Sequence, residues 1–180
     1  RWNLDNLKKG VDAETRVGRI IERAITANNC AVAHSVTEIA KIGDIDHIVA
    51  TPVAVWVIET RYQKVPQEQF SKVLNRIATN MNAVRQWAPD KTTVRGCLVL
   101  AYENESVKKS RWGTTDNGGK ENIAVYARPS LDTLEQEMRK EAGKTPSLDE
   151  RIAKKIWRLG SATGSEQPHG SDQIRGLEKS

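Results

Sequence analysis

Apolar residues recur at helical spacing in two long stretches of the chain and gather in several short runs. The first helical stretch covers residues 11–28, and the second runs from Pro66 to Trp87, where Pro66 suits a first helical turn. Short runs rich in β-branched residues predict strands before and after the second helix. These predicted strands are residues 30–38, 45–51, 53–60, 94–102 and 122–127, with a polar loop over 103–121.

The last part of the chain predicts further helices and then a polar tail. One helix follows Pro129-Ser130, and a second begins at Ser147, where Glu150 completes a capping box. Gly, Ser, Pro and charged residues dominate from Ser161 onward, which predicts disorder. The order is helix, three strands, helix, two strands (αβββαββ), with additional C-terminal helices. It indicates an α/β fold with a mixed central β-sheet flanked by helices.

Positive charge is concentrated in the middle of the chain. The formal net charge is +5, and residues 61–128 carry 12 basic and 6 acidic side chains, against 7 and 8 in residues 1–60. This distribution suits a polyanionic partner such as DNA or RNA. The longest apolar run, Val53 to Ile58, is too short to cross a bilayer, and no signal peptide opens the chain. We therefore expect a cytoplasmic protein without membrane contact, although the first residue is not Met and an upstream segment is not excluded.

Two acidic residues lie in the neighbouring predicted strands 45–51 and 53–60. Asp46 lies near the start of one strand and Glu59 near the end of the next. If the strands form a hairpin, both side chains lie at the same open end of the sheet. Two acids on an apolar sheet face are costly unless a cation compensates them, and Mg²⁺ prefers such oxygen ligands. The alternative is that Asp46 belongs to a turn and Glu59 forms an ordinary ion pair with Arg61.

A third acid, Glu14, falls within the apolar stripe of the first predicted helix. We expect it to face the sheet rather than bulk water. The alternative role is simple compensation of the helix dipole. His47 follows Asp46 but points to the opposite face of the strand, so we expect it to pack rather than to bind a ligand.

These residues lie in phrases that resemble a known family. Gly10-x-x-x-Glu14, Ile45–His47 and Val55–Glu59 are similar to the nuclease-related domain (NERD) family of the PD-(D/E)XK nuclease superfamily, over roughly residues 10–127. The resemblance implies a restriction-endonuclease-like core. We accordingly expect a NERD-like domain over residues 1–129, a helical extension over 130–160 packed on or beside it, and a disordered tail over 161–180.

The resemblance also implies a chemistry. The protein would be a Mg²⁺- or Mn²⁺-dependent (endo)deoxyribonuclease that hydrolyses phosphodiester bonds in DNA. Asp46, Glu59 and the main-chain carbonyl of Thr60 would hold the metal, and Glu14 would assist. Arg61 stands where the family has Lys, and an arginine stays charged and cannot act as a general base. We therefore expect an activity that is weakened or retuned.

A basic segment further along the chain is a candidate nucleic-acid contact. Lys108, Lys109 and Arg111 offer charges to phosphate, and Trp112 offers a ring on which a base can stack. The alternative is a solvated loop. Two other functions stay open for the whole chain: a catalytically inactive nucleic-acid-binding module of the same fold, and a structural domain that pairs subunits as a homodimer.

Overall fold

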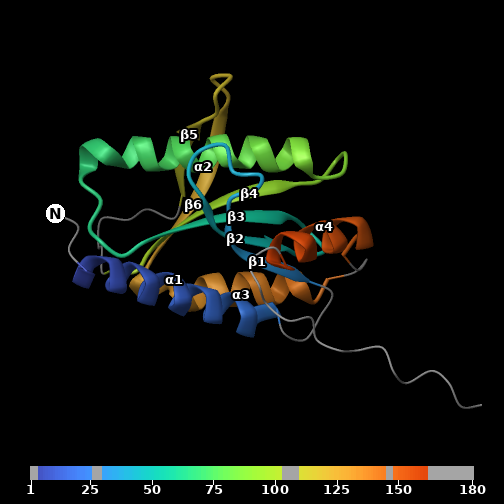
Figure 1. Ribbon diagram of the computed structural model, residues 1–180, viewed down its shortest axis with the longest axis horizontal. Coiled ribbons are helices and arrows are strands. Elements are labelled where there is room, and N and C mark those ends of the chain that lie inside the picture. The colour runs from blue at the N-terminus through green and yellow to red at the C-terminus, as the bar shows by residue number, and fades with distance from the viewer. Residues whose placement is uncertain (1–3, 26–29, 103–109, 145–147, 162–180) are drawn as a thin grey trace, which may run out of the picture.

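The computed structural model of the chain describes residues 4–25, 30–102, 110–144 and 148–161 (Figure 1). Its described strands form one mixed sheet in the order β1-β2-β3-β4-β6-β5. β1, β2 and β3 are antiparallel neighbours, β3, β4 and β6 run parallel, and β5 pairs antiparallel with β6. The strands are β1 (Ala31–Val36), β2 (Ile45–Ala50), β3 (Val55–Arg61), β4 (Val94–Leu100), β5 (Ser110–Thr114) and β6 (Lys120–Ala127).

Helices cover both faces of this sheet (Figure 1). Apolar side chains of α2 and α4 share one core cluster, and those of α1 and α3 share the other. A 3-10 turn over Arg128–Ser130 leads from β6 into α3. The helices are α1 (Leu4–Ile25), α2 (Gln67–Trp87), α3 (Leu131–Ala142) and α4 (Glu150–Ser161). The prediction of an α/β fold with a mixed, helix-flanked sheet is confirmed, and the arrangement is consistent with a restriction-endonuclease-like core.

Burial on both faces explains why β2 and β3 read as nearly continuous apolar runs. Ile48 and Val57 point to the side of the sheet that α2 and α4 cover, whereas Val49 and Ile58 point to the side of α1 and α3. Asp46 and Glu59 follow the same alternation as Ile48 and Val57, so they belong to the α2 face. Within the described residues no helix is both long and apolar enough to span a membrane.

The predicted polar loop over 103–121 is wrong in part, because it contains strand β5. Gly113 in this strand lies so close to α2 that a Cβ there would be 2.5 Å from the carbonyl oxygen of Leu74. A glycine of this kind suggests a loop in the sequence, but here it permits a close approach of two backbones. The predicted order of elements therefore lacks one strand.

The predicted start of the first helix at residue 11 is also wrong, because α1 begins at Leu4. Leu4 and Val11 are both exposed. Leu4, Leu7 and Val11 recur at helical spacing, but the charged residues and the glycine among them make the segment resemble a polar lead.

Candidate functional site

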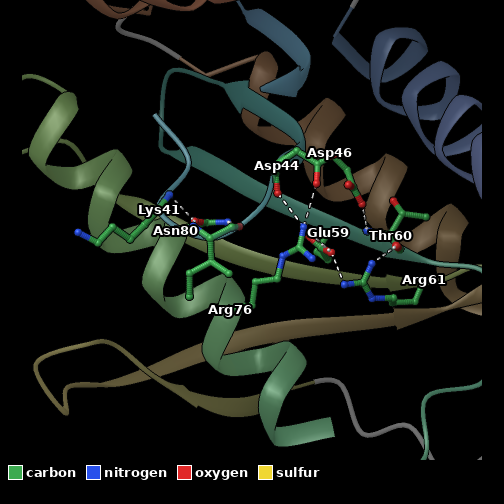
Figure 2. Close-up of polar contacts among 9 residues, drawn as sticks. Lys41, Asp44, Asp46, Glu59, Thr60, Arg61, Arg76 and Asn80 are labelled. Atoms are coloured by element: carbon green, nitrogen blue, oxygen red, sulfur yellow. Dashed lines mark hydrogen bonds and ion pairs between the residues drawn. The ribbon is translucent and has the colours of Figure 1, made fainter. Parts of the chain in front are cut away.

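The two predicted carboxylates meet at one end of the β2–β3 pair. His47 is opposite Ile58 in the antiparallel register, and one step further along brings Asp46 beside Glu59. Only 5% of Asp46 and 2% of Glu59 is exposed. The backbone N–H of Thr60 donates a hydrogen bond to Asp46 Oδ2 at 2.6 Å (Figure 2). This bond fixes the aspartate against β3 and leaves its other oxygen available.

Two guanidinium groups approach Glu59. Arg61 Nη2 is 2.6 Å from Glu59 Oε1, and Arg76 Nη2 is 3.6 Å from the same oxygen. Arg61 Nη1 also donates to the Thr60 carbonyl at 3.5 Å (Figure 2). The Arg61 cation therefore contacts two of the oxygen donors that the sequence suggests for a metal ion.

Arg76 was not foreseen from the sequence. It lies on α2, reaches across to the turn before β2, and donates to both the carbonyl and the side chain of Asp44 at 3.0 Å. The available signal was a basic residue three positions after Val73, at the edge of the apolar stripe of the helix. Asp44 itself precedes the strand and showed no pattern of its own.

The turn before β2 is shaped to receive Arg76. Gly43 has φ +64°, and a Cβ at this position would lie 2.8 Å from Arg76 Nη2, so both conformation and space favour glycine. Asn80 on α2 holds the same turn through three bonds: its Oδ1 accepts from the N–H groups of Lys41 and Ile42, and its Nδ2 donates to the Ile42 carbonyl. Contacts from α2 therefore fix the turn that leads into β2 and to Asp46.

The site carries more negative charge than its surroundings stabilise. Burial raises the pKa of Asp46, and neighbouring Glu59 raises it further, while the hydrogen bond from the Thr60 N–H lowers it. Burial also raises the pKa of Glu59, against the opposing effect of Arg61 and Arg76. Both shifts mean that the charged forms are poorly solvated, and an additional cation would relieve this cost.

Glu14 reaches this end of the sheet from α1. It is half-buried, and burial is the largest cause of its raised pKa, followed by the charge of Asp44. With Thr60 and Arg61 it lines a cavity of about 520 Å³. The prediction that Glu14 faces inward therefore agrees with its position, and it adds a third carboxylate to the surroundings of Asp46.

The donor chemistry suits a hard divalent ion. Within the described part of the chain, no group of three or more His, Cys, Asp or Glu side chains is arranged as a metal site. Two buried carboxylates and the Thr60 carbonyl nevertheless supply oxygen donors, and Mg²⁺ often binds to only one or two protein carboxylates. Glu59 Oε1 is buried without a hydrogen bond of good geometry, despite the nearby guanidinium groups. These residues fit the metal that the sequence suggests.

The predicted nucleic-acid contacts lie apart from these carboxylates. Lys108 and Lys109 fall outside the described residues. Arg111 and Trp112 belong to β5, which is separated from β3 by β4 and β6. Trp112 is 65% exposed, as a stacking surface requires. The structure therefore does not bring the described part of this segment, in β5, to the candidate site.

His47 is buried on the opposite side of β2 from Asp46. Its Nδ1 lies 2.7 Å from Nδ1 of His34, and His34 Nε2 lies 3.1 Å from Glu22 Oε1. Burial, aided by His34, lowers the pKa of His47 to about 3, so the ring is neutral. His47 packs between the sheet and α1, whereas its pairing with His34 was not foreseen.

Comparison with protein families gives one match that bears on this site. The sequence model of a family described as "nuclease-related domain" matches residues 9–112, which is more than half of the chain. The matched segment contains Glu14, Asp46, Glu59 and both arginines of the site. No curated protein and no solved structure matches the chain.

Proposed function

Because the chain belongs to the nuclease-related domain family, we propose that it is a nuclease that hydrolyses phosphodiester bonds in DNA with Mg²⁺ or Mn²⁺. One observation carries the proposal: the buried carboxylates of Asp46 and Glu59 lie side by side at the end of β2 and β3. Buried acids in such an arrangement are stabilised by a cation. The basic middle of the chain supports a polyanionic substrate.

Each residue of the site has a role in this proposal. Asp46, Glu59 and the Thr60 carbonyl would hold the metal ion. Such an ion, when bound, lowers the pKa of a water molecule and offsets the charge on phosphoryl oxygens. Asp46 is already oriented by the Thr60 N–H, which reduces the rearrangement that binding requires.

Arg61 orients the substrate in this scheme and does not move protons. Its guanidinium offers two parallel N–H donors to a phosphate. A phosphate that takes up these donors would also release Arg61 from Glu59. Glu14 is the remaining carboxylate, and its raised pKa makes a Glu14 oxygen a better proton acceptor from water than an exposed glutamate is.

A second candidate function is a nucleic-acid-binding module without catalysis. The observation in its favour is that Arg61 and Arg76 already compensate Glu59. Two guanidinium groups beside one carboxylate oppose the entry of a further cation. Such a protein would bind DNA through charge alone, with an affinity that falls steeply as salt rises.

Cleavage of plasmid and oligonucleotide DNA in Mg²⁺ or Mn²⁺ distinguishes the two functions. We expect the protein to cut, Arg61→Lys to cut faster because a lysine can position and deprotonate water, and Asp46→Ala to lose about 10²-fold or more. Exposed Asp90 provides the matched control, because Asp90→Ala removes a carboxylate far from the site. If neither the native protein nor Arg61→Lys cuts any DNA, while salt-sensitive binding persists, the nuclease proposal is wrong and the binding module is correct.

A further inference from the structure

The cavity beside Glu14 and Arg61 continues away from the two buried carboxylates. Its volume of about 520 Å³ falls within the range of sites that hold small organic molecules, roughly 300–1,000 Å³. Its far wall consists of the segment that joins β3 to α2 and of the first turns of α2. The residues lining this wall are Tyr62, Gln63, Lys64, Val65, Pro66, Gln69 and Val73.

The wall of the cavity is held in place by contacts on two sides. The N–H of Val65 donates to the Tyr102 hydroxyl at 3.0 Å, which ties the connecting segment to the end of β4. The ring of Tyr62 rests on α1 at Gly10, where an added Cβ would lie 3.2 Å from the ring. A cavity fixed in this way is formed before a ligand arrives.

The lining combines the surfaces that a nucleotide needs. Val65, Pro66 and Val73 give apolar area against which a base or sugar can pack, and Tyr62 adds an aromatic ring. Gln63 and Gln69 carry amides that can pair with the hydrogen-bonding edge of a base. These groups stand on the connecting segment and on α2, so they face the cavity from one continuous wall.

The charges in the cavity are divided in a way that orients such a ligand. Lys64 and Arg61 supply positive charge for phosphate, Glu14 supplies negative charge, and Arg61 is in direct contact with the buried Glu59. A phosphate placed at Arg61 would thus have its neighbouring nucleotide next to Lys64 and Gln69. Arg61 is the residue shared between the cavity and the ion pair with Glu59.

We propose that this cavity binds one unpaired nucleotide, adjoining the phosphate that Arg61 holds. The inference rests on the proposed function and specifies its substrate class: single strands, or the frayed ends and flaps of duplexes. A base that enters the cavity cannot remain paired with the opposite strand, and breaking a base pair of an intact duplex costs free energy. The cavity therefore favours nucleic acid in which one nucleotide is already free.

Direct binding in EDTA tests the cavity without any catalytic step. The probes are thymidine 5′-monophosphate, a short fluorescent oligothymidylate and a blunt duplex, measured by calorimetry and fluorescence anisotropy. We expect Lys64→Ala to weaken binding of the first two probes about tenfold, through loss of a charged contact, and Gln69→Trp to abolish it by filling the cavity. The exposed α2 residues Lys72 and Gln86 give the matched controls, and Lys72→Ala and Gln86→Trp should bind as the native protein does.

The opposite results overturn the proposal. If the cavity variants and their controls bind the monophosphate equally, or if the blunt duplex binds as tightly as the single strand, the cavity does not select an unpaired nucleotide. The outcome is separable from that of the nuclease proposal. Cleavage of DNA with unchanged binding by Gln69→Trp refutes the cavity alone, whereas cavity binding without cleavage by any variant refutes the nuclease alone.

Discussion

Glu59 lies between two guanidinium groups and a buried aspartate. The balance between these positive and negative charges determines whether Glu59 can bind a cation. Arg61 and Arg76 approach the same oxygen, Oε1, from β3 and from α2. A divalent ion bound to this carboxylate would bring further positive charge beside the two guanidinium groups, so the arginines act as competitors as well as neighbours. The ion pair of Glu59 with Arg61, which was the alternative explanation of these residues, is present alongside the convergence with Asp46.

Asp46→Asn is expected to stabilise the metal-free protein at neutral pH. The folded state raises the pKa of Asp46, so it binds a proton more tightly than the unfolded chain does. The stability linked to this proton is complete below the ordinary aspartate pKa of about 3.9 and is lost as the pH rises. Asparagine is neutral and keeps an oxygen for the Thr60 N–H, so it avoids the loss.

Thermal unfolding in EDTA at several pH values measures this effect. The gain in melting temperature from Asp46→Asn should grow from pH 5 to pH 8, with Asp90→Asn as the exposed control. An unchanged or lower melting temperature for Asp46→Asn across this range would show that burial of the Asp46 charge costs the fold nothing.

At the scale of the elements, α2 and the hairpin of β2 and β3 were predictable because their patterns are local. α2 has one apolar stripe, and β2 and β3 have dense β-branched runs. β5 was not predictable, because Gly113 and the polar residues of this strand are explained by its close contact with α2, which the sequence does not show. At the beginning of α1, Leu4 and Val11 are exposed and charged residues lie between them, so the segment resembles a polar lead.

The helices α3 and α4 pack directly on the sheet. Leu134 and Met138 of α3 are buried with α1 residues, and Ile156 of α4 is fully buried in the cluster that also holds α2. Glu141 of α3 accepts hydrogen bonds from Thr51 Oγ1 and Trp56 Nε1, both at 2.9 Å. These contacts place α3 and α4 in the two hydrophobic cores that also contain residues of β2 and β3, the strands that carry the site.

Ile156→Ala therefore should destabilise the whole protein. Removing a fully buried isoleucine costs about 2–5 kcal/mol, through lost burial and a residual cavity. Urea unfolding should remain a single transition with a lower midpoint, whereas Arg158→Ala on the exposed side of α4 should leave it unchanged. If Ile156→Ala instead produces a separate early transition while the rest of the protein unfolds as before, α4 is an independent extension.

At the scale of the whole molecule, the candidate site is assembled from four elements. Asp46 and Glu59 come from adjacent strands, Glu14 from α1 and Arg76 from α2. The two strand acids could be predicted because a hairpin brings them together within a short stretch of chain. Arg76, Asp44 and the nucleotide cavity could not, because they depend on how α2 crosses the sheet, and no local pattern encodes that crossing.

The exposed tryptophan and the buried carboxylates lie on different strands of the sheet, which the sequence alone did not show. Trp112 stands on β5 at one edge of the sheet, while the carboxylates lie near the other side, on β2 and β3. If both regions contact one nucleic acid, that nucleic acid must extend from β5 to the end of the β2–β3 pair.

The central claim is that Asp46 and Glu59 jointly hold a divalent cation, and a calorimetric titration with Mn²⁺ tests it most directly. Glu59→Gln should abolish the binding, and Arg61→Gln should strengthen it about tenfold, because it removes the competing positive charge. Glu121→Gln is the control, since Glu121 pairs with Arg85 away from the site. Mn²⁺ binding that is equal in the native protein, Glu59→Gln and Arg61→Gln, or absent from all three, would contradict the account.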